Sequence, residues 1–466
     1  MELPAEPLPD PEGHGALEIA GDGITVELAG DLRGAAPDAA GDGLAGFGIR
    51  VTGRNATLRG AHVSGYRIGI HVTADGVTLE DCDVSGNFRQ RLRSTPEKEA
   101  EEDWLAPHDN DAHEWTERYG AGIWIERSND VTVRRSRARA GQNGLVLERC
   151  ERASVYDNDF SFLSGWGIAL WRTSDGVIAR NACDFCVRGY SHGVYNRGQD
   201  SAGILLFEQC SRNVIAENSA THCGDGFFAF AGQEALGSRP PPEEGFDYHE
   251  RGCNENSIWG NDFSYAAAHG LELTFGFRNR IYKNRLVGNA ICGIWAGYSR
   301  ATSIVDNHFE KNGSAGYGQE RGGVNIEHGQ ANQIEANWFE SNVCGIHLWW
   351  DEDPGLQALP WMRANGDDSQ AFVLLNRFTR DGVAIQARGP TTLVVWNNMT
   401  NGVGIEFQVD REVQRIDAKE GEVPRAGELP CPELPGTSRP VGARIALRGR
   451  EHIRVGEWGP VEPDGR

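Results

Sequence analysis

The sequence is short of positive charge. Its 466 residues include 45 Lys and Arg against 67 Asp and Glu, which gives a formal net charge of −22 at pH 7. A surface of this sign repels phosphate backbones and anionic lipid headgroups, so nucleic acid is excluded as a partner. Long apolar runs are also lacking. Because none reaches the roughly 20 residues that cross a bilayer, we expect no membrane insertion.

The amino terminus lacks the features of an export signal. Met1 is followed by acidic and proline residues, without a basic region or an apolar core. We therefore expect no secretory signal in this chain. Two alternatives stay open at this point: the chain is a trimmed mature form, or the protein is cytoplasmic.

Close cysteine pairs are almost absent. The ten cysteines are scattered, and Cys183 and Cys186 form the single Cys-x-x-Cys pair. With His192, Cys210 or His222 nearby, this pair is a candidate metal site, but the sequence has no second Cys-x-x-Cys, so two packed thiols are favoured and no metal is expected. The scatter favours small apolar side chains packed in the interior.

Glycine, in contrast, is abundant and marks a repeat. Residues 256–350 contain four turns, each with an apolar segment that ends in Asn and a segment that starts with Gly. The asparagines are Asn261, Asn284, Asn307 and Asn337. The glycines are Gly270, Gly293, Gly323 and Gly345. The regular interval is 22 or 23 residues, and one turn carries a seven-residue insertion near residues 313–321.

A period in the low twenties with short alternating segments predicts a solenoid. No single turn buries its own apolar face, so the turns must stack. A leucine-rich repeat is excluded because its Leu-x-x-Leu-x-Leu-x-x-Asn pattern is absent. A parallel β-helix accounts for glycine at sharp corners, where a positive φ is tolerated, and for asparagines that stack between coils. One buried stack should contain Leu271, Ile294, Val324 and Ile346.

The repeat divides the chain into three parts. Residues 1–45 are rich in Pro, Gly, Ala and Asp and predict an irregular cap over the first coil. Residues 46–408 predict one all-β, single-stranded parallel β-helix of about thirteen coils, interrupted by loop insertions such as the charged stretch 88–118. Residues 409–466 predict a Pro-rich arm and a short β-hairpin near residues 443–455.

The Gly-started and Asn-ended segments resemble the right-handed parallel β-helix repeat of the pectin-lyase-like superfamily. The resemblance covers residues 46–408 and is nearest to the branch of carbohydrate-binding and sugar-hydrolase repeats. It implies a right-handed coil, a carbohydrate partner and an extracytoplasmic location. Because the superfamily includes lyases, glycosidases, epimerases and non-enzymatic surface proteins, it implies no single activity. Pro107-His108-Asp109 resembles the Pro-His-Asp of alginate C5-epimerases, but it lies in an insertion.

Long insertions predict a binding groove. They lie near residues 186–202, 231–253, 310–321 and 350–370. Insertions in a solenoid gather on one side, so we expect them to wall a groove across the Gly-started strands from Gly203 to Gly345. Aromatic rings cover the apolar faces of sugars, while amides and charged groups bind their hydroxyls. The residues expected to bind substrate are Phe228, Trp295, Tyr298, Arg321, Asn325, Trp349 and Trp350.

Outward carboxylates in these strands predict acid–base chemistry. Glu272 and Glu327 lie two coils and two residues apart, which places their Cα atoms about 12 Å apart. Side chains that lean together reach the separation of roughly 6–10 Å found in inverting glycosidases. One coil further, His347 is expected to orient a carboxylate or the substrate. Asp225 and His269 precede corner glycines in adjacent coils and are expected to form a carboxylate–imidazole pair.

Two other carboxylates take similar outward positions. Glu126 and Glu148 follow earlier corner glycines, but no aromatic residue accompanies them in the pattern. We expect both side chains to be solvated and to have no catalytic role.

Three functional readings follow. The first is a glycoside hydrolase without a cofactor, which cleaves a poly- or oligosaccharide with the carboxylates named above. The second is a lyase or epimerase that acts on uronates. Because the candidate strands carry no Lys or Arg, that reading needs a metal such as Ca²⁺, or the insertion residues Arg321 and Arg197, to offset the substrate carboxylate. The third is a non-catalytic protein that binds glycan. The pattern leaves the sugar, the linkage and the oligomeric state open.

Overall fold

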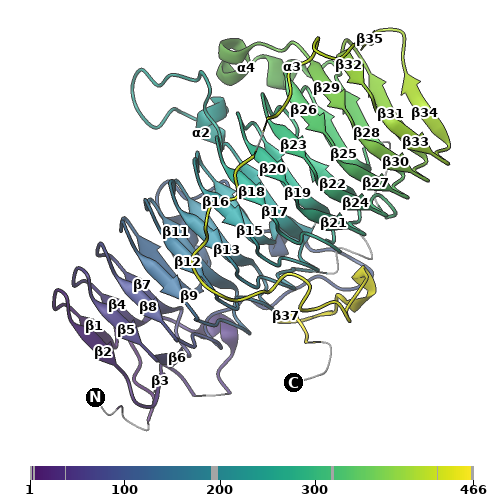
Figure 1. Ribbon diagram of the computed structural model, residues 1–466. Helices are drawn as coiled ribbons and strands as arrows, with labels where there is room; N and C mark the ends of the chain where they lie inside the picture. The colour runs from purple at the N-terminus through teal and green to yellow at the C-terminus, as the bar shows by residue number, and fades with distance from the viewer. Residues whose placement is uncertain are drawn as a thin grey trace. The chain divides into compact units, whose positions relative to one another are not determined.

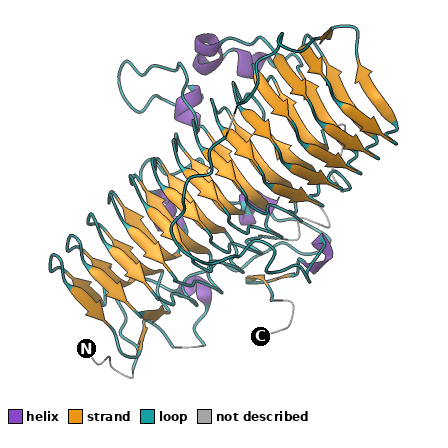
Figure 2. Cartoon of the chain, viewed as in Figure 1, coloured by secondary structure: helices purple, strands orange, loops and turns teal. Residues whose placement is uncertain are grey.

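The computed structural model describes residues 3, 6–36, 38–189, 198–315, 320–427 and 429–462, and strands dominate it (Figure 1, Figure 2). The chain forms two compact units. Unit 1 holds Met1–Leu205, Ala216–Gly224 and Leu434–Arg466, and unit 2 holds Leu206–Ile215 and Asp225–Glu433. Strands β15 (Ala202–Phe207) and β16 (Val214–Ala216) occur where the chain passes from one unit to the other.

Unit 1 is built from short parallel strands that pair with the strand one coil later. The first sheet contains, in order, β1 (Leu17–Ile19), β4 (Phe47–Val51), β7 (Ile68–Val72), β9 (Ala121–Glu126), β11 (Asn143–Glu148) and β13 (Trp166–Trp171). The second contains β2 (Thr25–Glu27), β5 (Thr57–Arg59), β8 (Thr78–Glu80), β10 (Thr132–Arg134), β12 (Ser154–Tyr156) and β14 (Val177–Ala179). A third pairs β3 (Asp31–Arg33) with β6 (His62–Ser64). The coils thus begin at Leu17, inside the segment expected to be an irregular cap.

Unit 2 repeats this plan. Its first sheet contains β17 (Asp225–Phe230), β19 (His269–Thr274), β22 (Cys292–Trp295), β25 (Gly322–Glu327), β28 (Cys344–Trp349), β31 (Val383–Arg388) and β34 (Ile405–Val409). The second contains β18 (Ser257–Trp259), β20 (Arg280–Tyr282), β23 (Ser303–Val305), β26 (Asn332–Glu335), β29 (Gln370–Leu374), β32 (Thr392–Trp396) and β35 (Gln414–Asp417). The third contains β21 (Arg285–Val287), β24 (His308–Glu310), β27 (Trp338–Glu340), β30 (Arg377–Thr379) and β33 (Met399–Asn401).

This architecture is the predicted all-β parallel β-helix. Between Gly48 and Glu406, the described chain contains thirteen strands of the first kind, from β4 to β34, which agrees with the predicted number of coils. The expected stack is also confirmed. Leu271 pairs with Ile294, Ile294 with Val324, and Val324 with Ile346, and each side chain is at most 1% exposed. Burial of such aliphatic columns is the main stabilising term of the fold.

The corner glycines are required for a different reason from the one expected. Gly293, Gly323 and Gly345 do not have a positive φ. A Cβ atom at Gly323 would lie 2.6 Å from the Gly345 carbonyl oxygen and 2.7 Å from the Phe339 ring. Glycine is therefore needed because the next coil and an interior phenylalanine approach too closely for any side chain. Positive φ values fall instead on residues just before the ladder asparagines, such as Lys283 and Asp306.

The predicted asparagine ladder is confirmed. The Nδ2 atom of Asn261 donates to Oδ1 of Asn284 at 3.0 Å, Asn284 donates to Asn307 at 3.0 Å, and Asn307 to Asn337 at 3.0 Å. Each Oδ1 also accepts the backbone N–H of the preceding ladder residue. The ladder continues to Asn376 and Asn398. These side chains satisfy backbone groups that the turn would otherwise leave buried without partners.

The cysteines behave as expected for packing residues. All ten lie in the described part of the chain, none forms a disulfide bond, and nine are buried. Burial raises the pKa of the Cys183 and Cys186 thiols. Among the described residues, no helix is long and apolar enough to cross a membrane.

The carboxy-terminal arm is extended and lies along the coils of each unit. In unit 2, Gln333 donates to the Pro424 carbonyl at 3.0 Å and Tyr282 to the Pro430 carbonyl at 2.5 Å. In unit 1, the Thr437 amide donates to Asp157 at 2.8 Å. The terminal hairpin is formed by β36 (Val455–Gly456) and β37 (Gly459–Pro460), whereas residues 443–446, expected to be a strand, form turns.

Candidate functional site

The outward row predicted from the sequence exists on the first sheet of unit 2. One residue from each successive strand occupies it, and consecutive members are paired in register. The members are Phe228, Glu272, Trp295, Asn325, His347 and Gln386. Glu327 lies two residues beyond Asn325 on β25, in a parallel row with Trp349 and Arg388.

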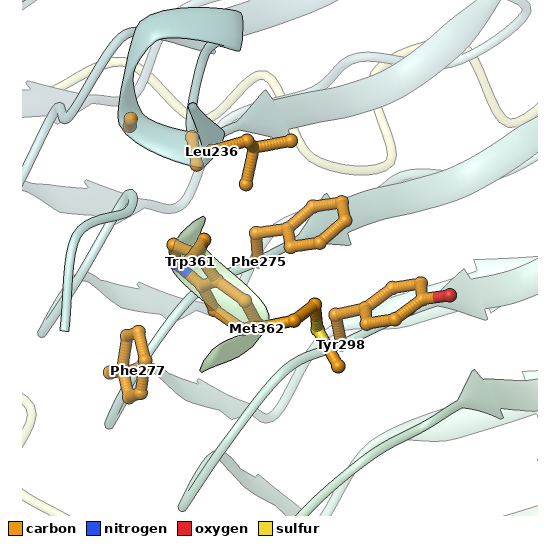
Figure 3. Close-up of a cluster of buried hydrophobic side chains, with 8 residues drawn as sticks. Leu236, Phe275, Phe277, Tyr298, Trp361 and Met362 are labelled. Atoms are coloured by element: carbon orange, nitrogen blue, oxygen red, sulfur yellow. The ribbon is translucent and has the colours of Figure 1, made fainter. Parts of the chain in front are cut away.

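Two of the predicted insertions pack together at the carboxyl ends of these strands. The insertion after β17 contains α2 (Gln233–Leu236), and the insertion after β28 contains α3 (Pro354–Gln357) and α4 (Pro360–Asn365). Leu236, Trp361 and Met362 from these helices form one buried cluster with residues that follow β19 and β22 (Figure 3). Trp361 is fully buried and donates to the Arg251 carbonyl at 2.8 Å.

A third insertion lies at the opposite ends of the strands. Ala315, from the insertion before β25, packs with Trp295 against a buried cluster that includes Ile291. Its backbone N–H donates to the Ala290 carbonyl at 3.2 Å. Insertions thus lie at both ends of the strands that carry the outward row. The fourth insertion, near residues 186–202, lies partly outside the described residues, and so does Arg197.

Glu327 occupies an unusual electrostatic position in this region. Burial raises the pKa of its carboxyl group to about 7, and Asp351 and Glu320 add to the effect while His328 and Tyr298 oppose it. The Tyr298 hydroxyl donates to Oε1 of Glu327 at 3.2 Å. The side chain is only partly buried. Glu327 is therefore a carboxyl group that can hold a proton near neutral pH and still reach solvent.

Glu272 lies beside two predicted neighbours, His269 and Asp225. Its Oε2 atom is 3.9 Å from Nε2 of His269, and its side chain is 22% exposed. Asp225 is brought to the same place, because its Oδ1 accepts the backbone N–H of His269 at 2.8 Å. One ligand-type atom from each of the three residues lies within 4.8 Å of the others. The expected Asp225–His269 contact is thus made, with the His269 backbone N–H as one donor to the Asp225 carboxylate.

Trp295 lies between the two carboxylates in register. It pairs with Glu272 on one side and Asn325 on the other. Its ring is 5.4 Å from the His269 ring and is partly exposed. The neighbouring Gly297 has no side chain that could cover it, and a Cβ there would be 3.5 Å from the Trp295 indole nitrogen. An indole in this position can stack on a ligand held between Glu272 and Glu327.

The structure corrects the expectation for His347. Its side chain is 1% exposed, and neither ring nitrogen has a hydrogen-bond partner among the described residues. It therefore does not orient Glu272 or Glu327. Burial, with a smaller effect of Arg388, lowers the pKa of the imidazole to about 3, so the ring is neutral. The adjacent Asn325 is also 1% exposed, and its Nδ2 likewise lacks a partner in the described chain.

Two aromatic residues expected to line a groove are buried instead. Tyr298 is 3% exposed, and its ring is stacked between Phe275 at 4.5 Å and His328 at 4.9 Å. Figure 3 shows its hydroxyl turned away from Trp361 and Met362. Trp349 is 5% exposed, donates to Oδ1 of Asn325 at 3.1 Å, and is covered by the Arg388 guanidinium at 4.4 Å. Neither ring is free to stack on a sugar.

The remaining predicted residues lie around this region in supporting positions. Phe228 is 5% exposed and packs edge-to-face on Phe207 at 5.1 Å. Trp350 is partly buried and donates to Asp367 at 2.7 Å. Arg321 is partly buried and donates to the Gly313 carbonyl at 3.4 Å.

The pattern missed several charged neighbours of Glu327. His328 is buried and hydrogen-bonded through Nδ1 to Asp367 at 3.0 Å, and its Nε2 is 3.5 Å from Asp351. These contacts raise its pKa although burial opposes them. Arg388 was missed because the corner of its coil was assigned to Gly382. Ile346, which follows the corner Gly345, pairs with Ile385, so the corner residue of the next coil is Ala384. Counting from Ala384 places Arg388 in the outward row of Trp349.

A further correction concerns unit 1. Glu126 and Glu148 were expected to be solvated, but the Glu148 side chain is 0% exposed and that of Glu126 is 21% exposed. His113, from the insertion 88–118, lies against both, with Nδ1 3.0 Å from Glu148 and 3.8 Å from Glu126. The periodic pattern gave no sign that this insertion folds onto the sheet.

Three groups of described residues have the donors and spacing for a metal ion. They are His113, Glu126 and Glu148 in unit 1, and Asp225, His269 and Glu272, and Glu327, His328 and Asp351, in unit 2. Each contains an imidazole. Ca²⁺ prefers six to eight oxygen ligands, whereas mixed nitrogen and oxygen donors suit zinc-class ions. The donor chemistry therefore favours a transition metal over the Ca²⁺ considered for a lyase.

Comparison with known proteins identifies the family. Residues 40–183, 116–238 and 243–356 match the family described as right-handed β-helix region. Because these matches cover more than half of the sequence, the chain belongs to the right-handed β-helix family. No curated protein matches it by sequence.

Several solved structures have a similar fold. The catalytic domain of a GH87 alpha-1,3-glucanase in complex with nigerose has 11% identity and a TM-score of 0.45, over 90% of this chain and 68% of that one. The AlgE6 A-module of Azotobacter vinelandii, a mannuronan C-5 epimerase, has 13% identity and a TM-score of 0.40, over 87% of this chain and 92% of that one. The Dettilon tailspike protein has 16% identity and a TM-score of 0.42, over 83% of this chain and 61% of that one. At these values the likeness is one of fold and assigns no activity to this chain.

Proposed function

We propose that the first sheet of unit 2 carries the active site of a glycoside hydrolase that acts on a poly- or oligosaccharide. The observation that supports it is a pair of accessible carboxylates, Glu272 and Glu327, on either side of Trp295 and in unequal surroundings. Glycosidic cleavage needs one protonated and one ionised carboxyl group, and unequal environments provide that difference at a single pH.

Glu327 is assigned the general acid. A pKa of about 7 leaves much of the group protonated at neutral pH, and such a group transfers a proton to a leaving oxygen effectively. The Tyr298 hydroxyl, which donates to Oε1 at 3.2 Å, positions the carboxyl group without occupying both oxygens.

Glu272 is assigned the base that activates water. Its side chain is 22% exposed, so water can reach it, and Nε2 of His269 lies 3.9 Å from its Oε2. The register places the Glu272 and Glu327 Cα atoms about 12 Å apart, from two strand spacings and two residues. Glutamate side chains that extend toward each other over Trp295 reach the roughly 6.5–9.5 Å of inverting enzymes. We therefore propose inversion of the anomeric centre.

A metal-assisted lyase or epimerase acting on uronates is the second candidate. The observation in its favour is the Asp225, His269 and Glu272 group, whose ligand-type atoms lie within 4.8 Å of one another. A divalent ion there would offset the carboxylate of a uronate and acidify its α-proton. Glu272 would then be a ligand instead of a base, so the two proposals assign it different roles.

A single screen separates these proposals. Neutral and uronic oligosaccharides are incubated with the full chain, with and without a chelator, and analysed for new reducing ends, unsaturated ends and binding. A hydrolase releases reducing ends without unsaturation and resists chelation. A lyase gives unsaturated ends, an epimerase changes the uronate composition, and either loses activity with the chelator. Binding without any product contradicts both enzymes and favours a glycan-binding protein.

A further inference from the structure

The strongest feature outside the proposed active site is a set of histidines and glutamates on the first sheet of unit 1. Glu126 and Glu148 take equivalent positions on β9 and β11, where they are paired in register. His71 lies one strand earlier, paired with Trp124, which precedes Glu126 by two residues. His113 comes from the insertion 88–118, immediately before α1 (Glu114–Arg118). Residues up to 77 positions apart (148 − 71 = 77) are thus brought together by the coil and one insertion.

The distances match a small tetrahedral cation. Nε2 of His71 is 3.6 Å from Oε2 of Glu126, Nδ1 of His113 is 3.8 Å from Glu126, and the same atom is 3.0 Å from Glu148. Ligands about 2.0–2.1 Å from a tetrahedral zinc ion lie roughly 3.3 Å from one another. The ligand-type atoms of His113, Glu126 and Glu148 all fall within 4.8 Å of one another.

Buried atoms without partners point to a missing ligand. The Glu148 side chain is 0% exposed, yet its Oε2 has no hydrogen-bond partner among the described residues. The Asn110 amide approaches this carboxyl group and favours its ionised form, although its Nδ2 makes no hydrogen bond of normal geometry in the described chain. A buried carboxylate oxygen left in this state is costly unless something else binds it.

The arginine next to Glu148 contacts its Oε1 atom and not its Oε2 atom. Arg149 contacts Oε1 of Glu148, the same atom that His113 approaches. Arg127 lies 3.5 Å from Oε1 of Glu126, whereas Oε2 of Glu126 faces His71. Oε2 of Glu126 thus faces His71, whereas the Glu148 oxygen nearest to His113 also contacts Arg149.

We propose that unit 1 carries a site for a divalent transition-metal ion of the zinc class, held by His113, Glu126 and Glu148, with His71 beside Glu126. An imidazole together with two carboxylates is a donor set that such ions prefer over Ca²⁺ or Mg²⁺. The ion binds the insertion 88–118 to β9 and β11 through His113. Because the His113 side chain is 37% exposed, the site keeps one side toward solvent. The proposal does not depend on the activity assigned to unit 2.

The test is Zn²⁺ binding by the full chain after treatment with a chelator, followed by calorimetry and by metal analysis after gel filtration. His113→Ala and Glu148→Gln remove one ligand each, and Glu117→Gln changes an exposed carboxylate on α1 as a matched control. Glu272→Gln removes a ligand of the other acidic and histidine group. We expect one tightly held Zn²⁺ per chain, with affinity lowered at least tenfold in His113→Ala and Glu148→Gln and unchanged in the two others.

Three results would overturn the proposal. They are no retained Zn²⁺ in the wild type, equal affinity in the wild type and His113→Ala, or loss of binding in Glu272→Gln alone. Circular dichroism checks each variant for folding. If Glu148→Gln fails to fold, His113→Ala decides, because it removes a partly exposed side chain from an insertion. Hydrogen exchange adds a second readout: Zn²⁺ should protect residues 110–118 in the wild type and not in His113→Ala.

Discussion

At the scale of single residues, the raised pKa of Glu327 bears both on its proposed role as an acid and on the stability of the fold. Its pKa of about 7 lies well above the ordinary 4.5, so the folded state binds this proton more tightly than the unfolded chain. The proton therefore stabilises the fold below pH 4.5, and that stabilisation is lost as the pH rises from 4.5 through 7. The full shift corresponds to about 3 kcal/mol, and partial exposure reduces this value.

The Glu327→Gln variant tests this assignment through stability. Glutamine cannot ionise, so the variant should unfold at higher denaturant concentration than the wild type at pH 8, by about 1–3 kcal/mol. At pH 4.5 the difference should nearly vanish. The measurement is urea unfolding at both pH values, with Glu352→Gln, an exposed carboxylate from the same region, as the control. A difference that does not change with pH would show that Glu327 is ionised like a surface glutamate.

The asparagine ladder gives a second prediction at this scale. Asn284 donates to Asn307 and to the Ile258 carbonyl, and its Oδ1 accepts both side-chain and backbone N–H groups of Asn261. Asn284→Ala leaves these buried groups without partners, so it should lower the unfolding free energy by about 2–4 kcal/mol. Thermal unfolding measures this, and Asn401→Ala, on an exposed position of β33, should have little effect. Equal stability of the two variants would argue against the ladder.

The face of the sheet on which each side chain lies could be predicted from the sequence, but its degree of burial could not. Alternation after the corner glycines correctly placed Glu272, Trp295 and Asn325 in one row. The same count could not show that Trp349 lies under Arg388 or that His347 is buried, because the covering residues follow no repeat. It also failed where the corner lacks glycine, as at Ala384.

At the scale of elements, the positions of the insertions could be predicted from the sequence, but their contacts could not. Interruptions of the 23-residue interval marked where they leave the coil. Nothing in the spacing indicated that α2 and α4 share one core, or that His113 folds back on β9 and β11. Such contacts depend on a few side chains such as Trp361, whose partners are distant in sequence.

Trp361 provides a prediction about these elements. Its ring packs on Phe275 at 5.0 Å and on Phe277 at 5.7 Å. Trp361→Ala should release both insertions while the coils, which have their own core, stay folded. Hydrogen exchange should speed up in α2, α3 and α4 and remain slow in β19 and β22. Leu359→Ala, at the edge of the cluster, is the control. Faster exchange throughout unit 2 would mean that the insertions and coils form one cooperative unit.

At the scale of the whole molecule, the net charge of −22 distinguishes classes of polysaccharide. An acidic protein repels an acidic polymer, and salt screens that repulsion. Binding of polyuronates should therefore strengthen when the salt concentration rises, whereas binding of neutral glycans should change little. Titrations at two ionic strengths measure this. Polyuronate binding that weakens with salt would point to a local basic or metal-bearing site and would favour the lyase proposal.

The central claim is that Glu327 donates the proton in glycosidic cleavage. The most direct test is the initial rate of reducing-end release by the wild type and Glu327→Gln, on a substrate identified by the screen and at equal saturation. The account predicts a rate lower by about three orders of magnitude in the variant, with substrate binding preserved. A variant rate within about tenfold of the wild type, in a folded protein that binds the substrate, would contradict it.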